Sequence, residues 1–360
     1  MKKLNLLLLT LFACLVACKK DKTTEPPIVD EGIAVVYTAG MTVDATGKSK
    51  ACYWKNNAIT LLSMPETAYG VSNTIIQKDK DIYVCGSFNN NGNFVGCVWK
   101  NGVKQDLTPV DGYPRVSPTK MFISGNDVYV TGSCSNGFDS KICYWKNGVP
   151  TVLTDVHDAG AINGTSSIWV NGNDIYITGL SVKYPSIEVA SYWKNGTRSD
   201  LIITHNTKWS RGKTIKFTNN TLYAGGYAYD ANNTMSQAMI WKNGIGQALP
   251  TLGEASVEDL DVNNTDVYAV GWYQRSLNAI NEACYWKNNA IVPLETQQSS
   301  QSQASSIHID NSDIYIAGTI RSTGSGLNVA VYWKNGTLVQ LPNPSGNKEA
   351  GTADIFIGRE

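Results

Sequence analysis

A tryptophan-centred phrase recurs seven times along this 360-residue chain. Its first copy reads Tyr53-Trp54-Lys55-Asn56-Asn57. The later tryptophans follow at spacings of 45, 46, 48, 48, 45 and 47 residues, at Trp99, Trp145, Trp193, Trp241, Trp286 and Trp333. Such a period in a β-rich sequence is typical of a propeller, in which each repeat is one blade that buries its faces only against its neighbours.

A single repeat predicts four short antiparallel strands. Residues 166–201 hold two β-rich runs on either side of Asn171-Gly172-Asn173, then a third run. The dipeptide Asn195-Gly196, the strongest two-residue hairpin signal, separates that third run from a fourth. Four strands of this kind make one propeller blade.

The two ends of the array complement one another. Ile355 lies 22 residues after Trp333, where other repeats place the centre of their first strand, and the chain ends soon afterwards. Residues 33–63 supply three strands that lack a first one. We therefore predict an all-β fold, a seven-bladed propeller over residues 33–360 that the C-terminal strand closes without an open sheet edge.

The order of Gly, Tyr and Trp within each repeat resembles kelch repeats. The phrase Ala-x-Tyr-Trp-Lys-Asn-Gly, followed by Leu eight residues after the Trp, is similar to the bacterial extracellular repeats named for a His-Ala-Phe motif. That tripeptide is absent here, and the paired glycines of kelch occur only at Gly225-Gly226. Both resemblances cover residues 33–357, and they imply a propeller without supplying catalytic residues.

The N-terminus reads as a bacterial lipoprotein signal over residues 1–17. Lys2 and Lys3 precede an apolar run that is shorter than the roughly 20 residues needed to span a bilayer. Leu15-Val16-Ala17-Cys18 looks like a lipobox, which implies cleavage before Cys18 and acylation of that residue. We expect residues 18–32, polar and proline-bearing, to be a flexible tether with a reach of roughly 20 Å.

These features predict an anchored envelope protein, most simply on the outer membrane and facing either the periplasm or the exterior. Without Lys2 and Lys3, the 30 basic and 30 acidic residues become 28 and 30. This balance gives no electrostatic reason to expect nucleic acid as a partner. We expect a monomer that contacts the membrane only through the lipid on Cys18 and needs no cofactor.

Six cysteines remain beyond Cys18, and an exported protein can pair cysteines. Four of them stand two residues before a repeated Trp, where small core residues are expected. Two hairpins of equal length carry the other two. If Cys85 and Cys97 oppose one another across the first hairpin, then Cys134 and Cys143 lie on opposite faces of the sheet in the second. Cys85 with Cys97 is then the candidate disulfide.

Residues that recur in every repeat serve the blade, whereas residues that occur once are free for function. The repeated Trp, Lys and Asp residues are therefore interpreted as packing, solvated and turn residues. The loops between second and third strands and between blades are long and variable, and they share one face of the ring, where binding usually lies. Aromatic and Arg residues cluster there in blades four and five, counted from the first repeat with all four strands. The predicted ligand site comprises Trp209, Arg211, Tyr227, Tyr229, Trp272, Tyr273 and Arg275.

Enzyme signatures are few. The three histidines, His157, His205 and His308, occupy non-equivalent positions, no metal motif occurs, and no nucleophile elbow is present. Lys216, Asp261 and His308 share one first-strand column in successive blades, where we expect a buried ionic lining of the channel. The sequence favours a binding module for a glycan, peptide or protein. The alternatives are a glycoside hydrolase or polysaccharide lyase, with carboxylate pairs such as Asp158 with Glu254 or Glu349, and a purely structural envelope role.

Overall fold

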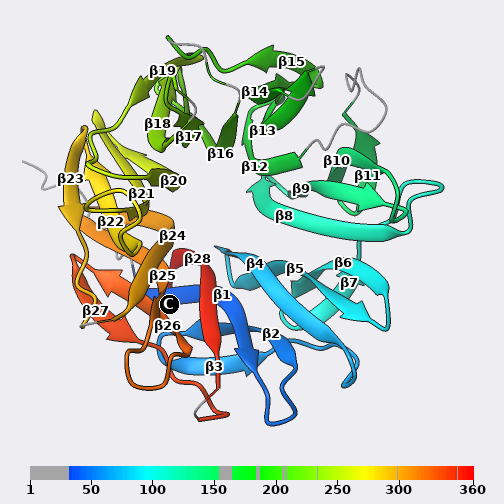
Figure 1. Cartoon of the computed structure of the whole chain (residues 1–360). Coiled ribbons are helices and arrows are strands. Elements are labelled where there is room, and N and C mark those ends of the chain that lie inside the picture. Colours follow the sequence, from blue (N-terminus) through cyan, green and yellow to red (C-terminus); the bar gives the residue numbers. More distant parts are fainter. Residues whose placement is uncertain are drawn as a thin grey trace, which may run out of the picture.

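A ring of seven four-stranded antiparallel blades makes up this all-β protein, as predicted (Figure 1). The structure is a computed structural model, and it describes residues 32–153, 164–183, 187–204, 207, 209–232, 234–297, 299–346 and 348–360. No helix occurs within these ranges, so none there is long and apolar enough to cross a membrane. The predicted signal peptide, Cys18 and most of the tether lie outside the described residues.

Six blades follow the chain in order from the innermost strand outward. Blades one to three consist of β4 (Tyr69–Lys78), β5 (Asp81–Asn90), β6 (Asn93–Lys100) and β7 (Val103–Asp106); β8 (Arg115–Ser124), β9 (Asp127–Ser135), β10 (Ser140–Lys146) and β11 (Val149–Val152); and β12 (Gly164–Asn171), β13 (Asp174–Lys183), β14 (Ile187–Lys194) and β15 (Thr197–Asp200). Blades four to six consist of β16 (Ser210–Thr218), β17 (Thr221–Tyr229), β18 (Ser236–Lys242) and β19 (Ile245–Ala248); β20 (Ala255–Asn263), β21 (Asp266–Tyr273), β22 (Glu282–Lys287) and β23 (Ala290–Pro293); and β24 (Gln301–Asp310), β25 (Asp313–Arg321), β26 (Asn328–Lys334) and β27 (Thr337–Gln340).

The seventh blade joins the two ends of the chain. Its strand order is β28 (Ala350–Arg359), β1 (Ala34–Val43), β2 (Ser49–Lys55) and β3 (Ala58–Leu61). In Figure 1 the red C-terminal strand lies beside the blue N-terminal one. β28 and β1 pair in antiparallel register from Ala34 with Arg359 to Thr42 with Ala350. This pairing confirms the predicted closure by the C-terminal strand.

The seven repeated tryptophans are the largest side chains of the core, and each is at most 1% exposed. They lie on the third strand of each blade and reach back toward the preceding blade. The Trp333 indole N–H donates to the Glu295 carbonyl at 2.7 Å, and the Trp54 indole N–H donates to the Pro342 carbonyl at 2.8 Å. The tryptophans therefore fasten neighbouring blades together, which confirms their structural interpretation.

The face formed by the short turns, called here the tight-turn face, repeats one polar arrangement. In blade three the Lys194 ammonium lies 2.7 Å from the Asp174 carboxylate, and the Asn195 amide donates to the same carboxylate at 2.7 Å. The hydrogen bond from Lys194 is the largest cause that lowers the pKa of Asp174. The equivalent lysines of blades one, two, five and six pair with Asp81, Asp127, Asp266 and Asp313. Most lysines on this face are thus neutralised by a turn aspartate.

The prediction for the cysteines is wrong in its choice of pair. Cys85 pairs with Val98, and Cys97 pairs with Gly86, so these two thiols lie on opposite faces of their sheet. Cys134 and Cys143 share a face, with their sulfurs 3.8 Å apart. The reason is hairpin register. As expected, the two cysteines share a sheet face in one hairpin and lie on opposite faces in the other, but the hairpin in which they share a face is the one of Cys134 and Cys143. All six described cysteines are free and buried.

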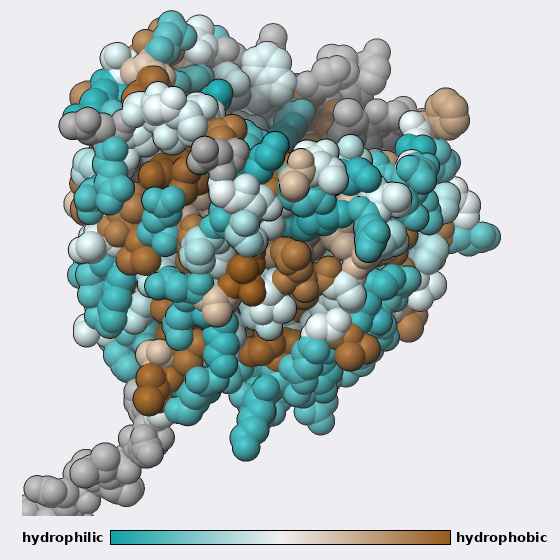
Figure 2. Space-filling model, turned by 90° about the horizontal axis from the view of Figure 1, so that it is seen from below, coloured by the Kyte–Doolittle hydropathy of each residue, from teal (hydrophilic) through white to brown (hydrophobic). Residues whose placement is uncertain are grey.

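The outer wall of the ring is mixed in polarity. Figure 2 shows brown apolar patches interleaved with teal hydrophilic residues on the face in view. Exposed apolar residues occur one at a time on the outermost strands of several blades, at Leu61, Val103, Val149 and Ile245.

Candidate functional site

Three aromatic residues of the predicted site lie together on blade four. Trp209 immediately precedes β16, and Tyr227 and Tyr229 end β17. The Trp209 and Tyr229 rings meet edge to face with centroids 5.4 Å apart, and Tyr227 lies 6.3 Å from Tyr229 in the same kind of geometry. Trp209 remains 38% exposed, so this cluster presents aromatic surface to solvent. It does so on the face that carries the long loops between second and third strands and between blades, called here the loop-rich face.

Blade four needs a glycine to bring these residues close to the inner strand. Gly226 lies on β17 beside Tyr227, and a Cβ at this position would lie 2.0 Å from the Arg211 carbonyl oxygen. No side chain fits at that distance, so Gly226 allows β16 and β17 to approach closely where Arg211 and Tyr227 pair.

Arg211 is held by a partner from the neighbouring blade. Its guanidinium makes two hydrogen bonds to the Glu188 carboxylate of β14, at 2.9 and 3.1 Å. These bonds are the largest cause that raises the pKa of Arg211. Because Glu188 occupies two of its donors and neutralises its charge, Arg211 has fewer donors left to offer a ligand.

Trp272 of blade five is linked to the same cluster through two charged residues. Its indole N–H donates to Glu258 at 3.3 Å, and the Lys213 ammonium lies 2.7 Å from that carboxylate. Lys213 also lies over the Tyr227 ring, 5.8 Å from its centroid. Trp209, Arg211, Tyr227, Tyr229 and Trp272 therefore form one continuous strip, called here the aromatic strip.

Tyr273 and Arg275 lie apart from the aromatic strip. Successive residues of a strand point to opposite faces, so Tyr273 turns away from the side of Trp272. It is 8% exposed and packs in the core between blades four and five. Arg275 makes two hydrogen bonds to Glu282, at 2.5 and 2.7 Å. The structure thus brings together five of the seven predicted site residues.

A second candidate site, which the sequence indicated only in part, fills the axial channel. Every inner strand carries a β-bulge at the same position, which turns one extra residue toward the axis. The seven bulge residues all line one cavity of about 320 Å³ toward the loop-rich face, and we call them the bulge ring: Asn73, Thr119, Ser166, Lys213, Glu258, Ser305 and Ala353.

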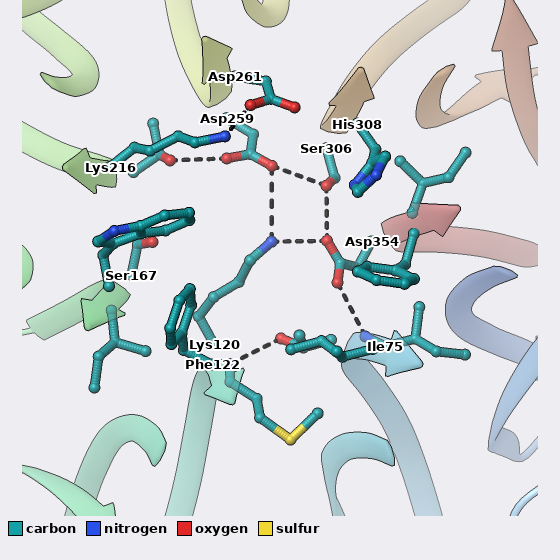
Figure 3. A pocket seen from close by; sticks show the side chains of 18 of the residues that line it. Ile75, Lys120, Phe122, Ser167, Lys216, Asp259, Asp261, Ser306, His308 and Asp354 are labelled. Atoms are coloured by element: carbon teal, nitrogen blue, oxygen red, sulfur yellow. Dashed lines mark hydrogen bonds and ion pairs between the residues drawn. The ribbon is translucent and has the colours of Figure 1, made fainter. Parts of the chain in front are cut away.

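The residues that follow the bulges form a second ring, called here the lysine ring: Thr74, Lys120, Ser167, Thr214, Asp259, Ser306 and Asp354. Figure 3 shows Lys120 pointing across the channel to the two aspartates. Its ammonium lies 2.7 Å from Asp354 and 3.7 Å from Asp259. The Ser306 hydroxyl oxygen lies between the same two carboxylates, 2.7 Å from Asp354 and 2.8 Å from Asp259, and can donate its one hydrogen to either. Burial would lower the pKa of Lys120, but the charges of Asp354 and Asp259 outweigh it and raise that pKa.

A third ring lies two residues further along the inner strands, and we call it the cavity ring: Ile76, Phe122, Trp169, Lys216, Asp261, His308 and Phe356. With the lysine ring it encloses a cavity of about 500 Å³ that extends toward the tight-turn face. Lys216 forms an ion pair with Asp261, as Figure 3 shows, and His308 lies in the same wall. The expected ionic lining is therefore confirmed for Lys216 and Asp261, and His308 lines the same cavity without an ion pair among the described residues.

Lys120, Asp259 and Asp354 are the channel residues that the sequence interpretation missed. A signal exists, because each stands directly before an apolar first-strand centre where the four other repeats all carry Ser or Thr. Of the remaining enzyme candidates, His157, Asp158 and His205 lie outside the described residues, so the carboxylate pairs of Asp158 with Glu254 or Glu349 stay predictions. Within the described part of the chain, no group of three His, Cys, Asp or Glu residues is placed to hold a metal ion.

No protein-family model matches this chain, and no curated protein matches it. Among solved structures, a puromycin-hydrolyzing peptidase of Mycobacterium tuberculosis is 12% identical with a TM-score of 0.56, covering 86% of this chain and 53% of its own. The β-propeller domain of the Trilobed protease from Pyrococcus furiosus is 9% identical with a TM-score of 0.48, covering 77% and 84%. The computationally designed Ika8 protein is 16% identical with a TM-score of 0.43, covering 86% and 97%.

The likeness to the peptidase supports the propeller fold alone. This chain spans about half of that peptidase's length, at an identity too low to carry residues across. The function must therefore be argued from the two sites themselves.

Proposed function

We propose that this protein is a lipid-anchored propeller of the bacterial envelope that binds a glycan, peptide or protein partner at its loop-rich face. The observation that carries the proposal is the aromatic strip, in which Trp209, Tyr227 and Tyr229 meet edge to face on a rigid scaffold. Large aromatic side chains of low conformational entropy supply contact area to such partners, and a few of them usually carry most of the affinity. The kelch-like order of each repeat supports the same interpretation.

The opposite face offers less to recognise. Its turns repeat one Lys, Asp and Asn arrangement, so most of its charges are already paired within each blade. The loop-rich face differs from blade to blade. A surface that discriminates between partners is better supplied by that variable face.

The position of the proposed anchor supports this orientation. The Ile33 amide N–H donates to the Glu360 carbonyl at 2.8 Å, and the Glu360 amide N–H donates to the Ile33 carbonyl at 3.1 Å. Residue 32 therefore joins the ring at the tight-turn face. A lipid on Cys18, attached through residues 19–32, then holds the tight-turn face toward the bilayer and leaves the aromatic strip facing away.

Changing Trp209 and Tyr229 to Ala together should weaken partner binding by at least about tenfold, because Trp209 is exposed and the half-buried Tyr229 packs edge to face against it. Binding is measured on immobilised glycan and peptide arrays, followed by calorimetry with the best probe. The matched control changes Lys146 and Lys334 to Ala on the tight-turn face. If the lysine variant loses binding and the aromatic variant keeps it, the assignment of the binding face is wrong.

Changing Cys18 to Ser should release the protein from the membrane fraction or leave an unprocessed precursor, because no acyl chain can then be attached at the processing site. Fractionation, mass spectrometry of the N-terminus and labelling with a fatty-acid analogue measure this. The control changes Cys134 to Ser, a buried cysteine of the ring, and should remain lipidated. Normal processing and membrane association of the Cys18 variant would remove the anchor from the proposal.

A further inference from the structure

The channel cavity, called here the axial cavity, is enclosed by walls of two kinds. One arc is aromatic: Phe122 and Trp169 lie with ring centroids 4.6 Å apart and tilted by 54°. Phe356 of β28 continues this arc next to His308, with centroids 4.9 Å apart. The opposite arc and the floor are polar, formed by the Lys216 and Asp261 pair and by the lysine ring (Figure 3).

The size of the axial cavity suits a small molecule. Its volume of about 500 Å³ lies within the 300–1,000 Å³ that is usual for small-ligand sites. Lys120 lines this cavity and the smaller one on the loop side, so the lysine ring separates the two. The axial cavity therefore ends in a polar floor, and a polymer threaded through the channel would have to break the Lys120 ion pair with Asp354.

Charge limits the class of ligand. The three lysines that line the cavity, Lys78, Lys120 and Lys216, are matched by three aspartates, Asp259, Asp261 and Asp354, so the lining carries no net charge with His308 neutral. Lys120 and Lys216 are already paired with Asp354 and Asp261, so an anion would have to compete with these carboxylates for their charge.

The carboxylates themselves are occupied, which also disfavours a strongly cationic ligand. The Ile75 amide N–H donates to Asp354 at 2.9 Å, and the Ile309 amide N–H donates to Asp261 at 2.9 Å. Asp259 accepts from the Thr214 hydroxyl at 2.7 Å. A cation would therefore have to displace existing hydrogen bonds. The best match is a neutral ligand.

Uncommitted hydrogen-bonding groups remain around the aromatic arc. The Lys120 ammonium has three N–H groups, and in the described part of the chain only the Asp354 carboxylate lies within hydrogen-bond distance of it. Burial is the largest cause that lowers the pKa of His308, so its ring stays neutral, with one nitrogen as donor and one as acceptor. Among the described residues, no partner hydrogen-bonds the Ser167 hydroxyl. The cavity thus combines apolar rings with donors and acceptors that can serve hydroxyl or carbonyl oxygens.

We propose that the axial cavity is a second binding site, separate from the aromatic strip, for a small neutral ring that bears hydroxyl groups, such as a mono- or disaccharide. The Lys216 ammonium lies over the Trp169 ring, 5.1 Å from its centroid. The C–H edges of the sugar therefore pack against the faces of Phe122 and Phe356, where the electron-rich ring attracts them, and against the part of Trp169 that lines the cavity. Its oxygens hydrogen-bond to Lys120, Ser167 and His308. Because the cavity extends toward the tight-turn face, the ligand approaches from the side opposite to the aromatic strip.

The test is a binding screen on the full-length protein, kept in a detergent without a sugar headgroup. The probes are glucose, galactose, mannose, N-acetylglucosamine and maltose, with glucuronate and glucosamine as charged comparisons. Saturation-transfer NMR and calorimetry at up to about 10 mM ligand should detect at least one neutral sugar. Glucuronate should bind at least about tenfold more weakly, because its carboxylate would lie near Asp259, Asp261 and Asp354 while Lys120 and Lys216 are already paired with two of them.

Two variants locate the site. Trp169→Leu keeps an apolar side chain but removes the aromatic face, and it should weaken sugar binding by about tenfold. Ser167→Ala removes one hydroxyl and leaves the ion pairs untouched, so it should fold even where Trp169→Leu does not, and it should weaken binding about fivefold. The double change of Trp209 and Tyr229 to Ala is the control, and it should bind the sugar as the wild type does.

Three results would overturn the proposal. They are the absence of binding by every neutral probe, wild-type affinity in Ser167→Ala, and equal binding of glucuronate. Loss of sugar binding in the double variant of Trp209 and Tyr229, with normal binding in Ser167→Ala, would move the sugar to the aromatic strip. The function proposed for that strip then stands, and the second site does not.

Discussion

Removing residues 350–360 should abolish the single cooperative melting transition of the full-length protein. The deletion takes away β28, the innermost strand of the closing blade, and leaves β1 with an unpaired edge. It also removes Ile355 and Ile357 from the core that they form with Tyr315. Exposed edges and apolar surface favour association, so size-exclusion chromatography should show aggregates, and calorimetry should show a broad transition.

The deletion also removes Asp354, and a point variant separates this effect from ring closure. Asp354→Asn keeps the strand but takes one negative charge from Lys120. It should melt cooperatively, at a lower temperature than the wild type. A truncated protein that melts cooperatively at the full-length temperature would contradict closure by β28.

A circular permutant supplies the positive control. Glu360 and Ile33 already exchange two backbone hydrogen bonds, so a short linker can place residues 348–360 in front of residue 33 without moving β28. This permutant should recover the cooperative transition. Its recovery would show that pairing with β1 matters, and that the position of the strand in the chain does not.

The architecture was predictable because the seven repeats can be aligned with one another, which shows the equivalent position in each blade. Each Trp marks the same place on the third strand, and each Asn-Gly or Asn-Asn marks the same hairpin turn. Asn195 and Gly196, for example, take φ values of 51° and 83°, as a tight two-residue hairpin requires. Closure of the ring was predictable because the C-terminal repeat has one strand without a blade, and the N-terminal repeat has three strands and lacks the first one.

The channel was harder to predict because a β-bulge leaves no clear mark in the sequence. At blade four the bulge lies between Gly212 and Thr214, and it turns Lys213 toward the axis. Simple alternation would have placed only one of Lys213 and Thr214 there. The pairing of Lys120 with Asp259 and Asp354 also joins blades two, five and seven, and it depends on the width of the ring.

The aromatic strip was likewise predictable from the sequence only in part. The clustering of Trp209, Tyr227 and Tyr229 was predictable, because they end paired strands of one blade. The separation of Tyr273 from Trp272 follows from strand alternation, which a grouping by loop position ignored. The link from Trp272 to Tyr227 through Glu258 and Lys213 required knowing that two neighbouring bulges face each other.

Changing Trp333 to Ala should lower the free energy of unfolding by roughly 3 to 5 kcal/mol, the usual cost of removing a large buried aromatic residue. Trp333 is fully buried in the core between blades five and six, with Val270, Ile307 and Leu338. The change leaves a cavity between two blades, and it leaves the Glu295 carbonyl without the indole N–H that donates to it at 2.7 Å. Urea denaturation followed by circular dichroism measures the effect.

Trp209→Ala is the matched control, since it removes the same side chain from an exposed position. Its effect on the free energy of unfolding should stay within about 0.5 kcal/mol, as for most surface substitutions. Trp333→Phe should fall between the two, because it keeps most of the apolar volume but loses the hydrogen bond to Glu295. Equal effects of Trp333→Ala and Trp209→Ala would contradict the division of tryptophans into those that fasten the blades and those that face a ligand. The predicted difference therefore tests the fold and the proposed binding face in one comparison.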